Sequence, residues 1–237
     1  MSKTGNKSLP QQIILITGAA EGLGRELALE LSSQGATIIL LDHEVPMLES
    51  LYDEIIEAGS PEPAIYPMQL AGATVEDFNA IPESIRQTFG RLDGIIHNAA
   101  ICKALTPLPL ISFEVWAEVM QVNLNAPFLL TQACLPLLKE SDDAFIMFIS
   151  DRVTEEDQNH AYRGAYGVSK AALDEFARIL EDEVSTNTNI RVLRNDPGPM
   201  RTRLRARMFP AQKSDNVKSA KEAVKTIIDL IAASVNA

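Results

Sequence analysis

Cysteine and histidine are both scarce in this chain. Among 237 residues there are 2 cysteines and 3 histidines, and neither Cys102 nor Cys134 stands at a spacing typical of a metal site. Two cysteines are too few for a disulfide framework, so we expect reduced thiols and a cytoplasmic protein. The histidines form no cluster with the cysteines, and no catalytic metal is therefore expected.

Basic residues and long apolar runs are also lacking. The chain has 21 Lys and Arg against 32 Asp and Glu, which gives a formal net charge of −11. Since nucleic acid and anionic membranes bind surfaces with an excess of Lys and Arg, neither is expected as a partner. No run approaches the ~18 apolar residues of a membrane span, and residues 1–8 are polar, unlike a signal peptide.

What the chain does contain is a regular alternation of two kinds of apolar segment. Short runs that predict buried strands lie at residues 11–17, 36–41, 92–98, 144–150 and 190–193. Segments with apolar residues at helical spacing lie at 25–31, 113–138, 164–184 and 220–233, the second bent near Pro127. This alternation predicts an α/β fold, a doubly wound parallel sheet with helices on both faces, and one domain over residues 1–237. In such sheets, ligands bind at the carboxyl ends of the strands.

A glycine-rich turn, Thr17-Gly-Ala-Ala-Glu-Gly-Leu-Gly24, joins the first predicted strand to the first predicted helix. Gly18 permits the tight turn, Gly22 lets the backbone approach a pyrophosphate, and Gly24 allows close helix packing. The helix N-terminus offers free N–H donors to that anion. A plain structural loop is the alternative, but the flanking strand and helix favour a dinucleotide site.

The second predicted strand leads into Asp42, where a carboxylate would accept hydrogen bonds from a ribose 2′-hydroxyl. A 2′-phosphate would be repelled by Asp42 and Glu21, and the glycine turn offers no nearby Arg or Lys to pair with it. NAD is therefore the expected cofactor, and NADP is disfavoured. Alternatively, Asp42 caps the helix entered near Pro46, and the two roles are compatible.

Tyr166 and Lys170 are four residues apart in a predicted helix, so their side chains share one face. An ammonium beside a phenol stabilises the phenolate, and Lys170 is therefore expected to lower the pKa of Tyr166 toward neutral pH. The phenol could then pass a proton to or from a substrate oxygen. Taken alone, such a pair is more often structural or solvated; the glycine turn is what favours a catalytic role.

Five motifs in order give the chain a resemblance, over essentially its whole length, to the classical short-chain dehydrogenase/reductase family. They are Thr17-Gly-x3-Gly-x-Gly24, His97-Asn-Ala-Ala100 in place of Asn-Asn-Ala-Gly, Asn123 in Val-Asn-Leu-Asn, Tyr166-x3-Lys170, and Asp196-Pro-Gly-Pro199 in place of Asn-Pro-Gly. Within the family the chain looks most similar to bacterial members described as 3-oxoacyl-(acyl carrier protein) reductases. The resemblance implies a Rossmann-type fold and hydride transfer between NAD(H) and a ketone or secondary alcohol.

The resemblance also implies roles for individual residues. Tyr166 would be the general acid/base, Lys170 would lower its pKa and hold the nicotinamide ribose, and Asn123 would anchor a water in a proton relay. For Asn123 the alternative is a side chain that satisfies backbone groups at a helix irregularity. Cofactor contacts are implied for Gly18, Glu21, Gly22, Leu23, Gly24, Asp42, Asn98, Ala99, Tyr166, Lys170, Pro197, Gly198 and Thr202.

One departure from the family pattern affects the expected chemistry. Ser150 stands at the first position of the family's Ser-Ser pair, and Asp151 stands at the second, which is normally the catalytic serine. We expect Ser150 to reach the site and donate a hydrogen bond to the substrate oxygen. If Asp151 points there instead, its carboxylate would repel a developing alkoxide. Adjacent residues on a strand point to opposite faces, so only one of the two can face Tyr166.

Other departures bear on the substrate. His97 is expected to be a packed, neutral strand residue. Asp196 adds negative charge near the nicotinamide edge and disfavours acidic substrates unless a basic group compensates. A cluster of four arginines is expected to form a solvated helix face, with an anionic or acyl-carrier-linked substrate as the alternative: Arg201, Arg203, Arg205 and Arg207.

The last residues bear on assembly. The chain finishes with a predicted helix and only four further residues, so the family's seventh strand is expected to be missing. A homodimer is expected, paired through the long helices around 116–138 and 165–184, with a tetramer as the alternative. Two functions stay open: an NAD-dependent oxidoreductase, which is favoured, and a nucleotide-binding relative that has lost redox turnover and acts as a sensor or interaction protein. Asp151 and Asp196 are what keep the second open.

Overall fold

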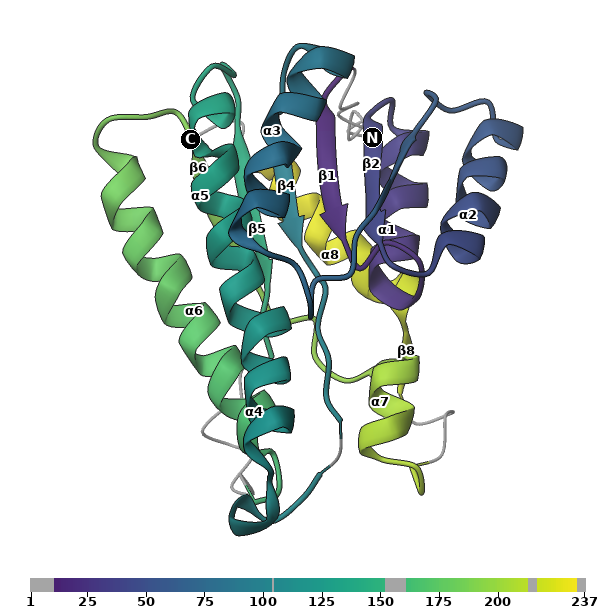
Figure 1. Cartoon of the computed structure of the whole chain (residues 1–237). Helices are drawn as coiled ribbons and strands as arrows, with labels where there is room; N and C mark the ends of the chain where they lie inside the picture. Colours follow the sequence, from purple (N-terminus) through teal and green to yellow (C-terminus); the bar gives the residue numbers. More distant parts are fainter. Residues whose placement is uncertain (1–10, 104, 152–160, 213–216, 234–237) are drawn as a thin grey trace, which may run out of the picture.

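A six-stranded parallel sheet forms the centre of the computed structural model, which describes residues 11–103, 105–151, 161–212 and 217–233 (Figure 1). The strand order is β3-β2-β1-β4-β5-β6, and every neighbouring pair is parallel. The strands are β1 (Ile13–Thr17), β2 (Thr37–Asp42), β3 (Ala64–Pro67), β4 (Gly94–His97), β5 (Phe145–Ile149) and β6 (Arg191–Asn195). The order reverses between β1 and β4, so the switch point lies at their carboxyl ends.

Helices cover both faces of the sheet, as the sequence predicts. One core contains side chains from α1 (Gly22–Ser33), α2 (Val45–Glu57) and α8 (Ala220–Ala233). The other contains side chains from α3 (Val75–Phe89), α5 (Ala126–Leu138) and α6 (Gly164–Ser185). Alternate strand residues supply the two cores, and all five residues of β1 and of β5 are buried. Burial on both faces explains why these strands are continuous apolar runs.

A buried carboxylate joins the amino ends of the central strands. Asp93 accepts hydrogen bonds from the backbone N–H of Ile13 at 2.8 Å and from Ser141 Oγ at 2.6 Å. Arg91 Nη2 lies 2.6 Å from the same carboxylate, whose side chain is 1% exposed. Because these partners satisfy the charge, Asp93 can be buried at this edge. The opposite edge is left for the loops that follow the strands.

The long helix predicted at 113–138 is interrupted. It consists of α4 (Phe113–Met120), a π-helical turn η2 (Gln121–Asn125) and α5, so the irregularity comes just before Pro127. A short 3-10 helix, η1 (Leu108–Leu110), precedes α4. Unpredicted by the sequence analysis, β7 (Met200–Arg201) and β8 (Lys218–Ser219) pair as a small second sheet, with α7 (Arg203–Met208) between them.

The described part of the chain has no strand after α8, and the central sheet has the six strands expected when the seventh is missing. Within the same residues, no helix is both long and apolar enough to cross a membrane. The expectation of one domain over residues 1–237 stays a prediction.

His97, the last residue of β4, is buried and neutral in the fold. Its Nε2 lies 2.8 Å from Thr131 Oγ1, and its ring stacks on Phe148 with 4.8 Å between centroids. Burial lowers the pKa of His97 to about 3. The expectation of a packed, neutral residue is therefore confirmed.

This burial predicts acid lability. An unfolded histidine binds a proton below about pH 6.5, whereas folded His97 stays neutral down to about pH 3, so stability is lost as the pH falls through this window. Between about pH 6.5 and pH 4.5, His97 should contribute about 2–3 kcal/mol to the fall in the free energy of unfolding. Urea titrations of wild type and His97→Asn should show that the variant loses less stability over this interval. Equal slopes for wild type and His97→Asn would contradict the prediction.

Candidate active site

The glycine turn forms a cradle without side chains at the carboxyl end of β1. A Cβ on Gly18, whose φ is +68°, would lie 2.9 Å from Ala99 Cα, and a Cβ on Gly24 would overlap the carbonyl oxygen of Gly18. Gly22 begins α1, and the preceding residue, Glu21, gives the helix no side-chain cap. The first N–H groups of α1 are therefore available to an anion. A dinucleotide pyrophosphate fits this cradle.

Hydrogen bonds from the end of β4 fix the glycine turn. Asn98 Nδ2 donates to the backbone oxygens of Thr17 and Gly18, both at 3.0 Å. Thr17 Oγ1 accepts from the backbone N–H groups of Asn98 and Ala99, both at 3.1 Å. Asn98 thus holds the cradle in place, while its contact with the adenosine stays a prediction.

Asp42, at the end of β2, is bound to the glycine turn. Its Oδ2 accepts from the backbone N–H of Ala20 at 3.2 Å, and its Oδ1 accepts from those of His43 at 2.7 Å and Glu44 at 3.3 Å. Because Glu44 is the residue that precedes α2, Asp42 does not itself cap that helix. The carboxylate is fixed beside the turn, where a ribose is expected.

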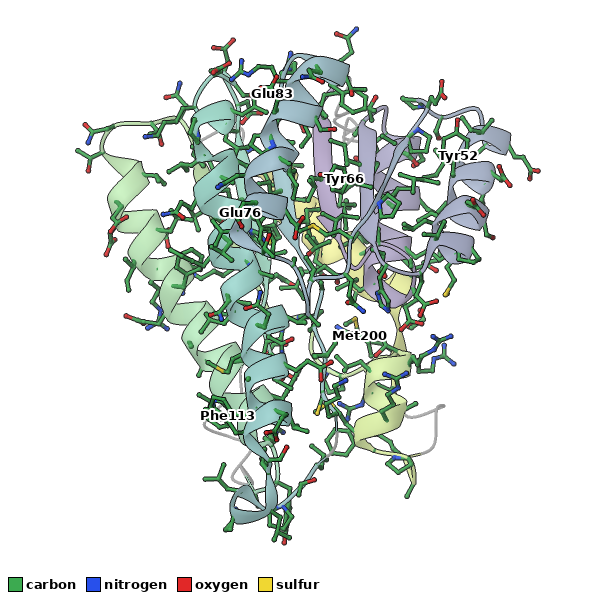
Figure 2. All side chains as sticks on the ribbon, in the orientation of Figure 1. Tyr52, Tyr66, Glu76, Glu83, Phe113 and Met200 are labelled. Carbon is green, nitrogen blue, oxygen red and sulfur yellow. The ribbon has the colours of Figure 1, made fainter. Side chains whose placement is uncertain are left out.

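The segment around α7 approaches the glycine turn from beyond the strand ends (Figure 1). Arg203 Nε lies 3.0 Å from Glu21 Oε2, and the methyl group of Thr202 lies 3.4 Å from the Cβ position of Gly22. The expectation that no basic residue lies near the turn is therefore wrong, because the fold brings Arg203 to it from a distant segment. Figure 2 shows Met200 between the strand ends and α7.

Tyr166 and Lys170 lie in the first half of α6, with 5% and 4% of their surfaces exposed. Lys170 Nζ donates to the backbone oxygen of Ile149 at 2.8 Å. Burial lowers the pKa of Lys170 to about 8, although the nearby charges of Asp151 and Asp196 act in the opposite direction. The predicted pair is thus present, and it is attached to the end of β5.

The phenol of Tyr166 is bonded to Asp151. Tyr166 Oη donates to Asp151 Oδ2 at 2.7 Å. Burial, followed by the charge and the hydrogen bond of Asp151, holds the pKa of Tyr166 well above its usual range. The pKa of Tyr166 is therefore raised, and not lowered toward neutral pH as expected, because burial and the carboxylate oppose the phenolate.

Ser150 does not take the expected place beside Tyr166. Its Oγ is buried and has no hydrogen-bond partner among the described residues, and its backbone N–H donates to the oxygen of Asn195. The side chain that contacts the Tyr166 phenol is that of Asp151. The expectation that Ser150, rather than Asp151, meets the phenol is thus corrected.

Asn123 lies in the π-helical turn, where its amide is fully engaged. Its Oδ1 accepts from the backbone N–H of Ile101 at 2.8 Å, and its Nδ2 donates to the oxygen of Ile101 and to Ser169 Oγ, both at 3.0 Å. These are the contacts expected of a side chain that satisfies backbone groups at a helix irregularity. Its role as a water anchor stays a prediction.

An apolar wall surrounds Tyr166 on the side of α7. Cys102 and Met208 form a buried cluster with the tyrosine, and three partly buried side chains pack against it: Leu105, Leu204 and Phe209. This wall could not be predicted from the sequence, because its members come from the segment after β4 and from the segment around α7, which are far apart in the chain. Such a surface suits an apolar substrate body.

The remaining predicted residues lie between β6 and α7. Asp196 Oδ1 accepts from the backbone N–H of Gly198 at 2.7 Å, which shapes the turn that follows Pro197. Thr202 caps α7 by accepting from the N–H of Arg205 at 3.2 Å. Arg205 in turn donates to Gln212 Oε1 at 2.7 Å and lies over the ring of Phe209.

Comparison with known proteins agrees with this geometry. The family model described as short chain dehydrogenase matches residues 12–213. The uncharacterized oxidoreductase YciK of Escherichia coli is 36% identical over 211 residues, which are 89% of this chain and 82% of that protein. A short chain dehydrogenase structure from Pseudomonas syringae superposes with a TM-score of 0.90 at 37% identity, covering 95% of this chain and 90% of that one. A Shigella flexneri short chain dehydrogenase complexed with NADP superposes with a TM-score of 0.89 at 35% identity, covering 95% and 92%.

These matches agree with the glycine cradle and with the buried Tyr166–Lys170 pair. The chain therefore belongs to the short-chain dehydrogenase family and is an oxidoreductase that uses a nicotinamide cofactor.

Proposed function

We propose that this protein transfers a hydride between NAD(H) and a secondary alcohol or its ketone. The observation that carries the proposal is the position of the Tyr166 phenol. It lies at the carboxyl edge that also holds the glycine cradle, with Lys170 one helical turn away and Asp151 in direct contact. A proton donor or acceptor next to a dinucleotide cradle is what this chemistry requires.

Each part of the site has a proposed task. The backbone around Gly18, Gly22 and Gly24 would hold the pyrophosphate, Asp42 the adenosine ribose, and Lys170 the nicotinamide ribose. When bound, the nicotinamide supplies or accepts the hydride. The proton that accompanies the hydride would pass through Tyr166.

The preference for NAD is supported by Asp42, although the Shigella flexneri relative is complexed with NADP. The Asp42 carboxylate is 10% exposed and fixed by backbone N–H groups. A 2′-phosphate placed against it would meet a like charge that cannot swing away. Arg203, the basic residue brought to the glycine turn, is already paired with Glu21.

An apolar substrate body is better supported than an anionic or acyl-carrier-linked one. The wall beside Tyr166 consists of apolar side chains and Cys102. Arg203 and Arg205, from the cluster that suggested an anion, are engaged with Glu21 and Gln212. An anionic or acyl-carrier-linked substrate is therefore less well supported than an apolar one.

A nucleotide-binding relative without redox turnover is the second candidate function, and the contact between Asp151 and Tyr166 favours it. An ionised carboxylate at this point would repel a developing alkoxide. Ketones and secondary alcohols incubated with NAD(H) distinguish the two: a change in absorbance of the reduced cofactor supports the oxidoreductase, and nucleotide binding without turnover supports the alternative.

We further propose a homodimer paired through α5 and α6, where Phe128, Val168 and Ile179 are 44%, 46% and 50% exposed. Light scattering should give twice the chain mass of 25.9 kDa, and Val168→Glu should move the protein toward the single-chain mass. A wild-type mass of one chain would contradict the dimer, and four chains would indicate the tetramer.

Asp42 is expected to determine cofactor choice. NADH should bind more tightly than NADPH, and Asp42→Ala should lower the ratio of the NADPH Kd to the NADH Kd by about tenfold, because a ribose contact and a phosphate repulsion are lost together. Calorimetric titration of both cofactors measures this. Glu57→Ala, at the far end of α2, is the control and should keep the wild-type ratio. Tighter binding of NADPH by the wild type would show that Asp42 does not select the cofactor.

The Tyr166–Lys170 pair is expected to divide catalysis and cofactor binding between its members. Tyr166→Phe should abolish turnover with little loss of NAD affinity, since the phenol acts on the substrate. Lys170→Ala should reduce both turnover and NAD affinity, because the ammonium would contact the ribose and its removal also leaves the Ile149 oxygen without its donor. Steady-state rates and NADH titrations separate the two effects. Full activity in Tyr166→Phe would exclude this mechanism.

A further inference from the structure

The hydrogen bond between Tyr166 and Asp151 uses the one proton that the phenol carries. An ionised carboxylate only accepts hydrogen bonds, and so does a ketone oxygen. A ketone that approaches this pair therefore meets acceptors on both residues. An alcohol differs, because its O–H can donate to the phenol oxygen, which retains its lone pairs.

Within the described residues, the one hydrogen bond of the Tyr166 and Asp151 side chains is the bond between them. Ser150 Oγ is buried and forms no hydrogen bond with the described residues, including Tyr166 and Asp151. Lys170 is buried and directed at the oxygen of Ile149. Arg163 Nη1 lies 4.0 Å from the other carboxylate oxygen, Asp151 Oδ1.

From this geometry we infer that the site takes an apolar secondary alcohol, rather than the ketone, as its ground-state ligand, and that Asp151 accepts the proton that leaves Tyr166 during oxidation. The inference rests on the proposed function and adds the direction of the reaction, which is oxidation of the alcohol. Asp151 acts through Tyr166 and is therefore a positioning and proton-accepting residue.

Oxidation of the alcohol requires one acceptor for a hydride, which the oxidised nicotinamide cofactor would supply, and one acceptor for a proton, which Asp151 would supply through Tyr166. The carbinol C–H bond breaks, and its electron pair leaves with the hydrogen as a hydride to the cofactor. The alcohol proton passes to Tyr166 Oη while the phenol proton passes to Asp151 Oδ2 along the 2.7 Å hydrogen bond. The carbon–oxygen double bond forms and the ketone leaves. The Asp151 side chain is 37% exposed, so it can return its proton to water.

Kinetics with matched substrates test the inference. Wild type and Asp151→Ser are compared with cyclohexanol plus NAD⁺ and cyclohexanone plus NADH, and with menthol and menthone in the same way. When the cofactor affinities are unchanged, the equilibrium of the reaction fixes the ratio of kcat/KM for alcohol oxidation to kcat/KM for ketone reduction, so a substitution cannot change that ratio. The readout is therefore the ratio of the ketone KM to the alcohol KM. This ratio should fall at least about tenfold in Asp151→Ser, since the ketone gains a donor. In Asp151→Asn, which keeps the shape but cannot hold the proton, the kcat for oxidation should fall about 10²-fold.

Titration of the phenol gives a readout that does not depend on turnover. Three groups bear on the charge of Tyr166: Asp151, Arg163 and Cys102. Replacing the carboxylate in Asp151→Ser should move the Tyr166 titration to lower pH. Near-ultraviolet absorbance of phenolate, with Tyr166→Phe subtracted, measures this. Glu175→Gln, an exposed charge change on the same helix, should leave it unchanged.

Several outcomes would overturn the inference: wild type that oxidises neither alcohol, an unchanged KM ratio in Asp151→Ser, an unshifted phenol titration, or a tenfold loss of ketone affinity in Ser150→Ala. Titration of NADH fluorescence distinguishes failure of this inference from failure of the proposed function. If NADH binds wild type and Asp151→Ser equally while the ratio is unchanged, the inference alone fails. If wild type binds neither NADH nor NADPH, the proposed function fails with it.

Discussion

The contact between the glycine turn and the end of β4 is the constraint on which the rest of the site depends. Asn98 and Thr17 exchange hydrogen bonds across these two strand ends, and the approach is close enough that Gly18 and Gly24 have no room for a Cβ. Here the strand order reverses, and in open parallel sheets this switch point is where ligands bind. The glycine turn cannot move away from β4, so the start of α1 is held at the switch point.

A second set of polar contacts places the tyrosine opposite that cradle. Asn123 connects the π-helical turn to Ile101 after β4 and to Ser169 on α6, and Lys170 connects α6 to the end of β5. Since Ser169 and Lys170 are adjacent to the turn of α6 that carries Tyr166, the phenol is fixed relative to both strand ends. The cost of burying these polar side chains is offset in part by these hydrogen bonds.

The fold was largely predictable from the sequence, because buried parallel strands and amphipathic helices leave distinct periodicities. The glycine cradle and the Tyr166–Lys170 pair were predictable for the same reason, as each depends on local spacing. The partner of the phenol was not, since alternation along β5 says that Ser150 and Asp151 diverge but not which of them α6 approaches. The pairing of Arg203 with Glu21 and the apolar wall depend on segments that meet only in the folded chain. The raised pKa of Tyr166 likewise follows from burial.

The two acidic departures from the family pattern act on the same group. Burial of Lys170 favours its neutral form, and the charges of Asp151 and Asp196 both favour the ammonium. The carboxylates therefore help to keep a buried lysine charged. In the binding mode proposed above, they would also leave the surroundings of the nicotinamide richer in negative charge. An oxidised nicotinamide ring carries a positive charge and a reduced ring carries none, so this surplus stabilises the oxidised form more. In the proposed binding mode, Asp151 would thus favour the oxidised cofactor as well as the alcohol, and both preferences would favour oxidation.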